Sequence, residues 1–202
     1  MAKKAESTLI NMLLALTLIA FVASLALALV NKVTVEPIAK VEKEKKANAI
    51  KNVLPPFEGE PVCDSVLVEI DAAKHDSVLL PRYTACDANG NLVGRAVETF
   101  DKNGFGGKLS AMVGFDADGN ITGYEILGSS ETPGLGAKAD QWFQEGNKGC
   151  VIGMNPADGL QVKKDGGQVD AITGSTITSR AFCRLVNAAY SAFQYDEKGG
   201  NE

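Results

Sequence analysis

The chain has 202 residues, of which 45% are hydrophobic and 22% charged, enough for one folded domain with a hydrophobic core and an accessory segment. Its net charge of −5 is unevenly distributed: residues 55–202 contain 12 Lys and Arg against 21 Asp and Glu, whereas residues 1–54 contain 8 against 4. Because an acidic domain repels nucleic acid, the charge argues against a nucleic-acid partner. The positive charge instead lies near a strongly apolar segment.

That segment is residues 9–30, which are apolar apart from three small polar residues. As a helix it is about 33 Å long at about 1.5 Å per residue, enough to cross the hydrocarbon layer of a membrane. The alternative is a cleaved signal peptide, and Ala26-Leu27-Ala28 resembles a cleavage site. The apolar region of a signal peptide usually has only about 7–15 residues, so we predict an uncleaved single transmembrane helix.

The charges that flank the segment give a slight orientation signal. Lys3 and Lys4 precede it, while Lys32 follows it and is soon joined by Glu36. Positive residues favour the cytoplasmic side of a cell membrane. We therefore expect residues 1–8 to be cytoplasmic and the main domain to be extracytoplasmic, which means periplasmic where the membrane is an inner membrane.

Residues 31–56 connect the apolar segment to the main domain. Apolar positions recur within residues 37–54 around the charged run VEKEKK, which favours a helix, with a solvated linker as the alternative. Pro55-Pro56 would stop such a helix. We take residues 57–195 as the main domain and residues 196–202 as a polar tail.

The main domain has strand-like patterns followed by a helical one. The stretches VLVEI, SVLLPRYTACDANGNLVGRAVET and GKLSAMVGFDADGNITGYEIL alternate in polarity, and their Asn-Gly and Asp-Gly pairs predict hairpin turns. A helix is predicted from Thr176 to Tyr195, because apolar residues fall on one face there: Phe182, Leu185, Val186, Ala189 and Phe193. The predicted fold class is α+β, with antiparallel hairpins backed by helices.

The second Asp-Gly turn imitates a calcium-binding loop. Asp116, Asp118 and Glu125 match the third, fifth and twelfth positions of an EF-hand, but Gly114 occupies the first position, where a carboxylate is needed. The flanking segments also alternate as strands rather than helices. We therefore predict no calcium site.

Catalytic and metal-binding residues are not predicted anywhere in the chain. His75 is the only histidine, so a histidine-based triad or multi-histidine metal site has no other member, and we expect His75 at the surface. The glycine-rich run 104–107 lacks phosphate-loop spacing and predicts a tight turn. Four cysteines without a C-x-x-C pair argue against iron–sulfur or zinc sites and leave disulfides and free thiols both open: Cys63, Cys86, Cys150 and Cys183.

Two segments carry the functional signal. Residues 170–179, DAITGSTITS, crowd hydroxyls and a glycine at the start of the predicted helix, where free amides and the helix dipole favour a phosphate. Ordinary helix capping by Ser and Thr explains the same residues. Residues 131–136, ETPGLG, predict a tight and preorganised turn.

Together these motifs, about 40 residues apart behind one N-terminal span, resemble the G subunits of Rnf electron transport complexes. The close relative is the C subunit of the sodium-pumping NADH:quinone oxidoreductase, which has the same FMN-binding domain. The resemblance covers nearly the whole chain. Two positions depart from the family pattern: Ser175 stands where Ala is commoner, and Ser129 or Ser130 stands where many relatives have His.

The resemblance implies a covalent FMN. In that family a flavin transferase of the ApbE type moves FMN from FAD to the last Thr of the S/T-G-A-T segment, which corresponds to Thr176. The remaining cofactor-binding residues follow from motif position. Around the phosphate we expect Thr173, Gly174, Ser175 and Thr178, and near the flavin ring Glu131, Thr132, Gly134 and Leu135.

The resemblance also implies the function. The chain would relay electrons at the outer face of a membrane complex that transfers them between ferredoxin and NAD, coupled to translocation of sodium ions or protons. Its partners would be the A, B, C, D and E subunits of the Rnf complex, above all the one named D, which carries a second covalent FMN. The alternatives are membership of the quinone oxidoreductase, or a membrane-tethered scaffold without redox function in which the TGST segment only caps a helix.

Overall fold

The computed structural model describes residues 8–71 and 76–195. His75, Lys3, Lys4 and the polar tail lie outside the described residues. The chain divides into two compact units, residues 1–44 and residues 45–202, which are described separately.

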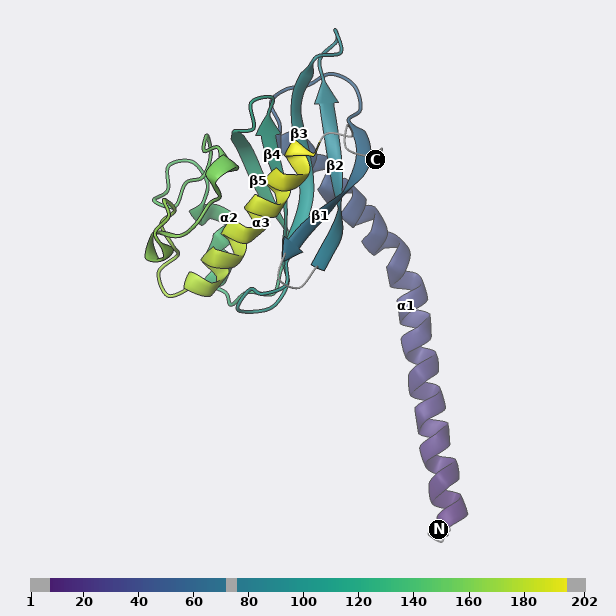
Figure 1. Ribbon diagram of the computed structural model, residues 1–202. Helices are drawn as coiled ribbons and strands as arrows, with labels where there is room; N and C mark the ends of the chain where they lie inside the picture. The colour runs from purple at the N-terminus through teal and green to yellow at the C-terminus, as the bar shows by residue number, and fades with distance from the viewer. Residues whose placement is uncertain (1–7, 72–75, 196–202) are drawn as a thin grey trace. The chain divides into compact units, whose positions relative to one another are not determined.

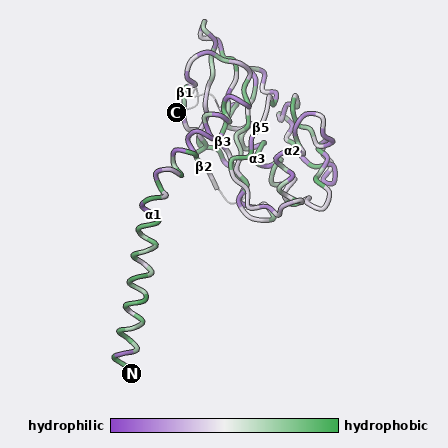
Figure 2. The backbone as a smooth tube through the Cα atoms, turned by 180° about the vertical axis from the view of Figure 1, so that it is seen from behind, coloured by the Kyte–Doolittle hydropathy of each residue, from purple (hydrophilic) through white to green (hydrophobic). Residues whose placement is uncertain are grey.

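The first unit consists of the larger part of helix α1 (Leu9–Val53). The two helical segments expected from the sequence are one continuous helix here, and it passes through Pro37 at the cost of a backbone hydrogen bond. Every large apolar side chain from Leu9 to Val41 is more than half exposed. Figure 2 shows the N-terminal part of α1 mostly in the hydrophobic colour. Among the described residues α1 is the one helix that is long and apolar enough to cross a membrane.

The second unit is built on one antiparallel sheet whose five strands follow the chain in the order β1-β2-β3-β4-β5 (Figure 1). The hairpin prediction is confirmed. The strands are β1 (Val62–Asp71), β2 (Asp76–Cys86), β3 (Leu92–Asp101), β4 (Leu109–Asp116) and β5 (Ile121–Ser129).

Both predicted Asp-Gly and Asn-Gly turns close hairpins. Gly90 N–H donates to Asp87 O over 3.0 Å, and Gly119 N–H donates to Asp116 O over 3.2 Å. Both glycines have φ above +80°, the left-handed conformation that favours glycine. The Asp116 carboxylate accepts from the backbone N–H groups of Asp118 and Asn120. The flanks of this turn are strands β4 and β5, as the sequence predicts.

Helix α3 (Thr176–Gln194) closes the domain and matches the helix predicted over residues 176–195. Between β5 and α3 the chain forms only short helical turns. These are η1 (Gly136–Lys138), α2 (Ala139–Trp142), η2 (Pro156–Asp158) and η3 (Lys163–Asp165).

The sheet buries both of its faces. Helix α3 lies across one face, where Phe182 packs on Tyr124 of β5 with ring centroids 4.8 Å apart and Phe193 meets Phe115 of β4 at 5.2 Å (Figure 1). On the other face the last turns of α1, from Lys45 on, bury Ile50 and Val53 against strand residues. Each fully buried Phe contributes roughly 1.5–3 kcal/mol by removal of apolar surface from water. The fold class is therefore α+β, as predicted.

Arginines of the sheet hold the C-terminal end of α3. Arg82 on β2 is 4% exposed, pairs with Asp64 on β1, and donates to the carbonyl of Ala192 over 3.0 Å. Arg95 on β3 donates to the carbonyl of Phe193 over 2.6 Å. These bonds satisfy carbonyls that have no partner within the helix, and they place positive charge at the negative end of its dipole.

We predict that Arg82→Ala lowers the free energy of unfolding by about 3–5 kcal/mol, because Asp64 and the helix carbonyls lose a buried charged partner. Urea unfolding of the detergent-solubilised chain, followed by the fluorescence of its single tryptophan, measures this. Arg180→Ala is the control: it breaks an exposed ion pair with Asp165 and should have a much smaller effect. Equal losses in the two variants would contradict the prediction.

The four cysteines are free thiols in the structure. Cys63 on β1 is exposed, whereas Cys183 on α3 is buried and burial raises the pKa of its thiol to about 12. Because the thiolate is the reactive form, we predict that a thiol reagent at about pH 8 modifies Cys63 and leaves Cys183 untouched until the chain unfolds. Peptide mass spectrometry after timed labelling reads this out. Equally fast labelling of both thiols in the folded chain would show the assignment to be wrong.

Candidate functional site

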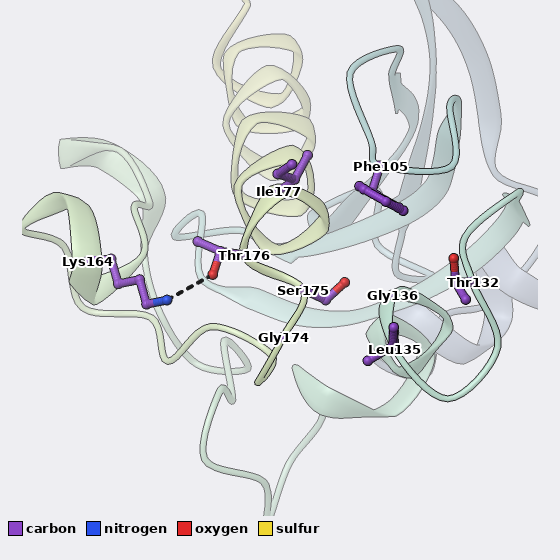
Figure 3. A pocket seen from close by; sticks show the side chains of 9 residues that line it. All are labelled: Phe105, Thr132, Leu135, Gly136, Lys164, Gly174, Ser175, Thr176 and Ile177. Carbon is purple, nitrogen blue, oxygen red and sulfur yellow. Dashed lines mark hydrogen bonds between the residues drawn. The ribbon is translucent and has the colours of Figure 1, made fainter.

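A cavity of about 310 Å³ lies at the start of α3. This volume is at the lower end of the roughly 300–1,000 Å³ range of small-molecule sites. Figure 3 shows that its walls come from segments far apart in the sequence. The lining residues are Phe105, Thr132, Leu135, Gly136, Lys164, Gly174, Ser175, Thr176 and Ile177.

The ETPGLG segment forms one wall through a tight turn, as predicted. The N–H groups of Leu135 and Ala137 both donate to Thr132 O over 3.2 Å. Pro133 and Gly134 occupy the two central positions, and Gly134 has φ +78°, which a turn of type II requires at its third residue. The turn leaves the Leu135 side chain 44% exposed, at the cavity.

The TGST segment forms the opposite wall through a second tight turn. Ser175 N–H donates to Ile172 O over 2.9 Å, and Gly174 inside this turn has φ +78°. Ser179 fastens the turn to the helix, because its hydroxyl accepts from Ile172 N–H and donates to Ser175 O. The chain then enters α3 at Thr176.

The structure brings the two motifs together. A Cβ atom at Gly174 would lie 3.5 Å from Leu135 Cδ2, and a Cβ atom at Gly136 would lie 2.8 Å from Thr178 Oγ1. The second distance is too short for any side chain, so the ETPGLG turn can approach the first turn of α3 only because Gly136 has none.

The first turn of α3 has no side-chain cap among the described residues. Ser175 is the N-cap residue but makes no capping hydrogen bond, and its hydroxyl is instead 2.9 Å from Thr178 Oγ1. The first N–H groups of a helix have no acceptor within the helix, and the Ser175 side chain does not supply one here. Helix capping therefore does not explain the hydroxyls of this segment. An uncapped helix start of this kind suits an anion such as a phosphate.

Thr176 presents the hydroxyl at this helix start. Its side chain is half-buried, and its Oγ1 accepts a hydrogen bond from Lys164 Nζ over 3.1 Å (Figure 3). Of the described residues that line the cavity, Lys164 is the one that carries a charge. The cavity thus has a polar end, with a hydroxyl, a cation and a helix N-terminus.

Four of the site residues expected from the sequence do not line the cavity. Thr173 and Gly134 are exposed in the two turns. Thr178 is fully buried beneath Ser175. Glu131 is 7% exposed, and its carboxylate oxygens have no hydrogen-bond partner among the described residues. Thr132, Leu135, Gly174, Ser175 and Thr176 do line it.

Sequence reasoning missed Phe105, Lys164, Gly136 and Ile177. The glycine run around Phe105 is a tight turn, as predicted, in which Gly104 and Gly107 exchange backbone hydrogen bonds. The backbone of this turn lies directly against the start of the ETPGLG segment. A Cβ atom at Gly106 would clash with the carbonyl oxygen of Ser130, the residue before that segment. Phe105 at its tip is 67% exposed. An aromatic residue between glycines was the sequence feature that could have indicated a ligand-binding role for this turn.

We predict that Gly106→Ala lowers the free energy of unfolding by about 1–3 kcal/mol, because the added methyl forces the two backbones apart. Phe105→Ala is the matched control in the same turn, and its exposed side chain should contribute little to stability. Urea unfolding of both variants and of the wild type measures the two changes in the free energy of unfolding. A neutral Gly106→Ala together with a destabilising Phe105→Ala would refute this account of the turn.

Comparison with known proteins gives the site a family context. A family model described as an FMN-binding domain matches residues 104–191, a range that includes the Phe105 turn and both motifs. The chain is 37% identical over 191 residues to the G subunit of the Na(+)-translocating ferredoxin:NAD(+) oxidoreductase complex of Acetobacterium woodii, covering 90% of this chain and 89% of that one.

Two further matches have lower identity. The G subunit of the ion-translocating oxidoreductase complex of Methanosarcina acetivorans is 35% identical over 188 residues, covering 92% of this chain and 93% of that one. Among solved structures, the NqrC crystal structure from Shewanella oneidensis has a TM-score of 0.45 and 19% identity, covering 69% of this chain and 66% of that one.

Proposed function

The chain belongs to the family of G subunits of Rnf-type ion-translocating oxidoreductase complexes, and from this premise we propose that it is a membrane-anchored electron carrier whose FMN is bound covalently to Thr176. The observation that carries the proposal is the meeting of the ETPGLG and TGST motifs at one cavity, with the Thr176 hydroxyl at its polar end. The match of an FMN-binding domain model to residues 104–191 supports the identity of the cofactor.

The residues present suit a flavin phosphate at one end of the cavity. The uncapped amides of the first turn of α3 and the positive end of its dipole favour an anion next to Thr176. Gly174 is exposed and lines the cavity, and it has no side chain to fill the space beside Thr176. A phosphate attached to Thr176 Oγ1 would lie beside these donors.

The other end of the cavity suits an aromatic ring. Phe105, Leu135 and Ile177 are partly exposed apolar side chains that line it from three different segments. Apolar walls exclude water and favour contact with a flat aromatic ligand. Bound there, FMN supplies a ring that accepts and releases electrons, while the surrounding protein tunes its potential. The chain needs no catalytic side chain of its own for this role.

Attachment is a phosphoryl transfer to the Thr176 hydroxyl. Thr176 Oγ forms a bond to the FMN phosphorus of FAD, the pyrophosphate bond of FAD breaks, and AMP leaves with the hydroxyl proton on its phosphate. We propose that a flavin transferase of the ApbE type catalyses this step. The exposed approach to the helix start, where Thr173 and Gly174 lie at the surface, leaves room for such an enzyme. A covalent bond then retains the cofactor without tight reversible binding.

Helix α1 supports a membrane-anchored arrangement. We propose that residues 9–30 span the membrane, that the N-terminus is cytoplasmic, and that residues 57–195 form the extracytoplasmic flavin domain. The exposed apolar side chains of α1 support this arrangement, since no described part of the chain covers them. The partners are the other subunits of the complex, especially the one with a second covalent FMN, with which this domain exchanges electrons.

We predict that the full-length chain co-expressed with the transferase carries one FMN that survives denaturation, and that Thr176→Ala carries none. Intact-mass spectrometry and in-gel flavin fluorescence measure this, and peptide mapping locates the adduct. Ser191→Ala is the matched control: it removes an exposed hydroxyl from the far end of the same helix and should leave the adduct intact.

Two results would overturn the assignment. A Thr176→Ala chain that still carries covalent flavin would show that another residue is the acceptor. A wild-type chain without covalent flavin would favour noncovalent flavin binding or a scaffold role, and its absorbance spectrum after gentle purification would separate those two.

A further inference from the structure

Lys164 is a cation for which neither motif accounts. It lies in η3, 12 residues before Thr176, and its Nζ donates to Thr176 Oγ1 over 3.1 Å. Figure 3 shows the Lys164 side chain extending to the Thr176 hydroxyl from outside the helix, while Phe105, Thr132 and Leu135 lie on the other side of the helix start. The charge of Lys164 therefore lies at the polar end of the cavity.

The neighbouring cations and anions are already paired with one another. Lys163 pairs with Asp170 at 2.6 Å. Arg180 pairs with Asp165 through two hydrogen bonds of 2.6 Å. Within the described part of the chain, Lys164 has no carboxylate at ion-pair distance, so its hydrogen-bonding partner there is the Thr176 hydroxyl alone.

The backbone around Lys164 is fixed rather than free. The N–H groups of Asp165 and Gly167 both donate to Val162 O, and Gly166 ends η3 with φ +88°. Val162 also bridges to Val169, which closes the loop at its base. The Asp165–Arg180 pair then ties this loop to the first turns of α3. The loop that contains Lys164 is therefore held by hydrogen bonds within itself and by an ion pair to α3.

We propose that Lys164 is the positioning residue of the flavin attachment site. Its ammonium group orients Thr176 Oγ and stabilises the negative charge on that oxygen as the bond to phosphorus forms and the pyrophosphate bond of FAD breaks. After transfer, the ammonium group holds the negative charge of the phosphoester at the helix start. This inference rests on the proposed attachment of FMN to Thr176.

The charge balance of the domain supports this role. Residues 55–202 have a large excess of acidic side chains, so a flavin phosphate approaches a surface that repels it on average. The ammonium group of Lys164 and the positive end of the α3 dipole add positive charge at the point where the phosphate would bind. A lysine at this point supplies a charge that a neutral donor would lack.

The test compares Lys164→Gln and Lys164→Arg with wild type, and uses Lys163→Gln as the matched control. Lys163 is the neighbouring lysine on η3, is also exposed, and does not line the cavity. Full-length proteins purified without flavin are incubated with an ApbE-type transferase, FAD and Mg²⁺. The rate of covalent flavin incorporation is measured by in-gel fluorescence at two salt concentrations, and thermal unfolding checks that each variant is folded.

We expect Lys164→Gln to slow incorporation about tenfold or more, as loss of one charged donor to a reacting oxygen typically does. Lys164→Arg should recover most of the rate because it restores the charge, and Lys163→Gln should stay within about twofold of wild type. The ratio of the wild-type rate to the Lys164→Gln rate should fall at the higher salt concentration, because salt screens the ammonium group that only the wild type has.

The outcomes separate this inference from the proposed function. A Lys164→Gln rate equal to wild type, or an equal slowing by Lys163→Gln, overturns the role of Lys164 while leaving Thr176 as the acceptor. A slow Lys164→Gln that Lys164→Arg does not rescue also overturns it, because the charge would then be irrelevant. Absence of covalent flavin in wild type overturns the proposed function itself, and this inference with it.

Discussion

The packing of α3 on the sheet is the constraint on which the site depends. Aromatic side chains hold the body of the helix against the sheet, with Phe182 packed on Tyr124 of β5 and Phe193 packed on Phe115 of β4. Arg82 and Arg95 bind the carbonyls at its C-terminal end. A helix fixed along its length has a fixed beginning, so the place where its unpaired amides and positive dipole end point is decided by contacts far from Thr176.

Close backbone approach then assembles the cavity around that beginning. The ETPGLG turn reaches the first turn of α3 because Gly136 has no side chain, and the glycine-rich turn that carries Phe105 reaches Ser130 because Gly106 has none. Glycines are thus used here for proximity as well as for turn conformation. Three segments remote in sequence can therefore enclose one cavity without a large or rigid lid.

Polar groups lie unevenly around the cavity. The Glu131 carboxylate lies behind the wall without a hydrogen-bond partner among the described residues, and it is so close to Gly136 that a Cβ atom there would clash with its Oε2. The front of the cavity has Lys164 and the helix N-terminus. The positive charge of Lys164 and the positive end of the α3 dipole therefore place the anion-binding end of the cavity at Thr176.

Local patterns in the sequence determined much of this molecule. Apolar length predicts the spanning segment of α1, polarity alternation and Asn-Gly or Asp-Gly pairs predict the hairpins, and helical periodicity predicts α3 almost to the residue, since all of these depend on neighbours along the chain. The two motifs indicated Thr176 through family resemblance, whereas physical reasoning alone permitted capping equally well.

Only the tertiary structure decided that Ser175 makes no capping bond, that Thr178 and Glu131 are buried, and that Phe105 and Lys164 meet Thr176 at one cavity. Those facts depend on how α3 packs on the sheet and on how closely Gly106 and Gly136 approach neighbouring segments. Contacts between segments that are distant in the chain produce no periodic pattern or fixed spacing in the sequence, so sequence patterns could not predict them.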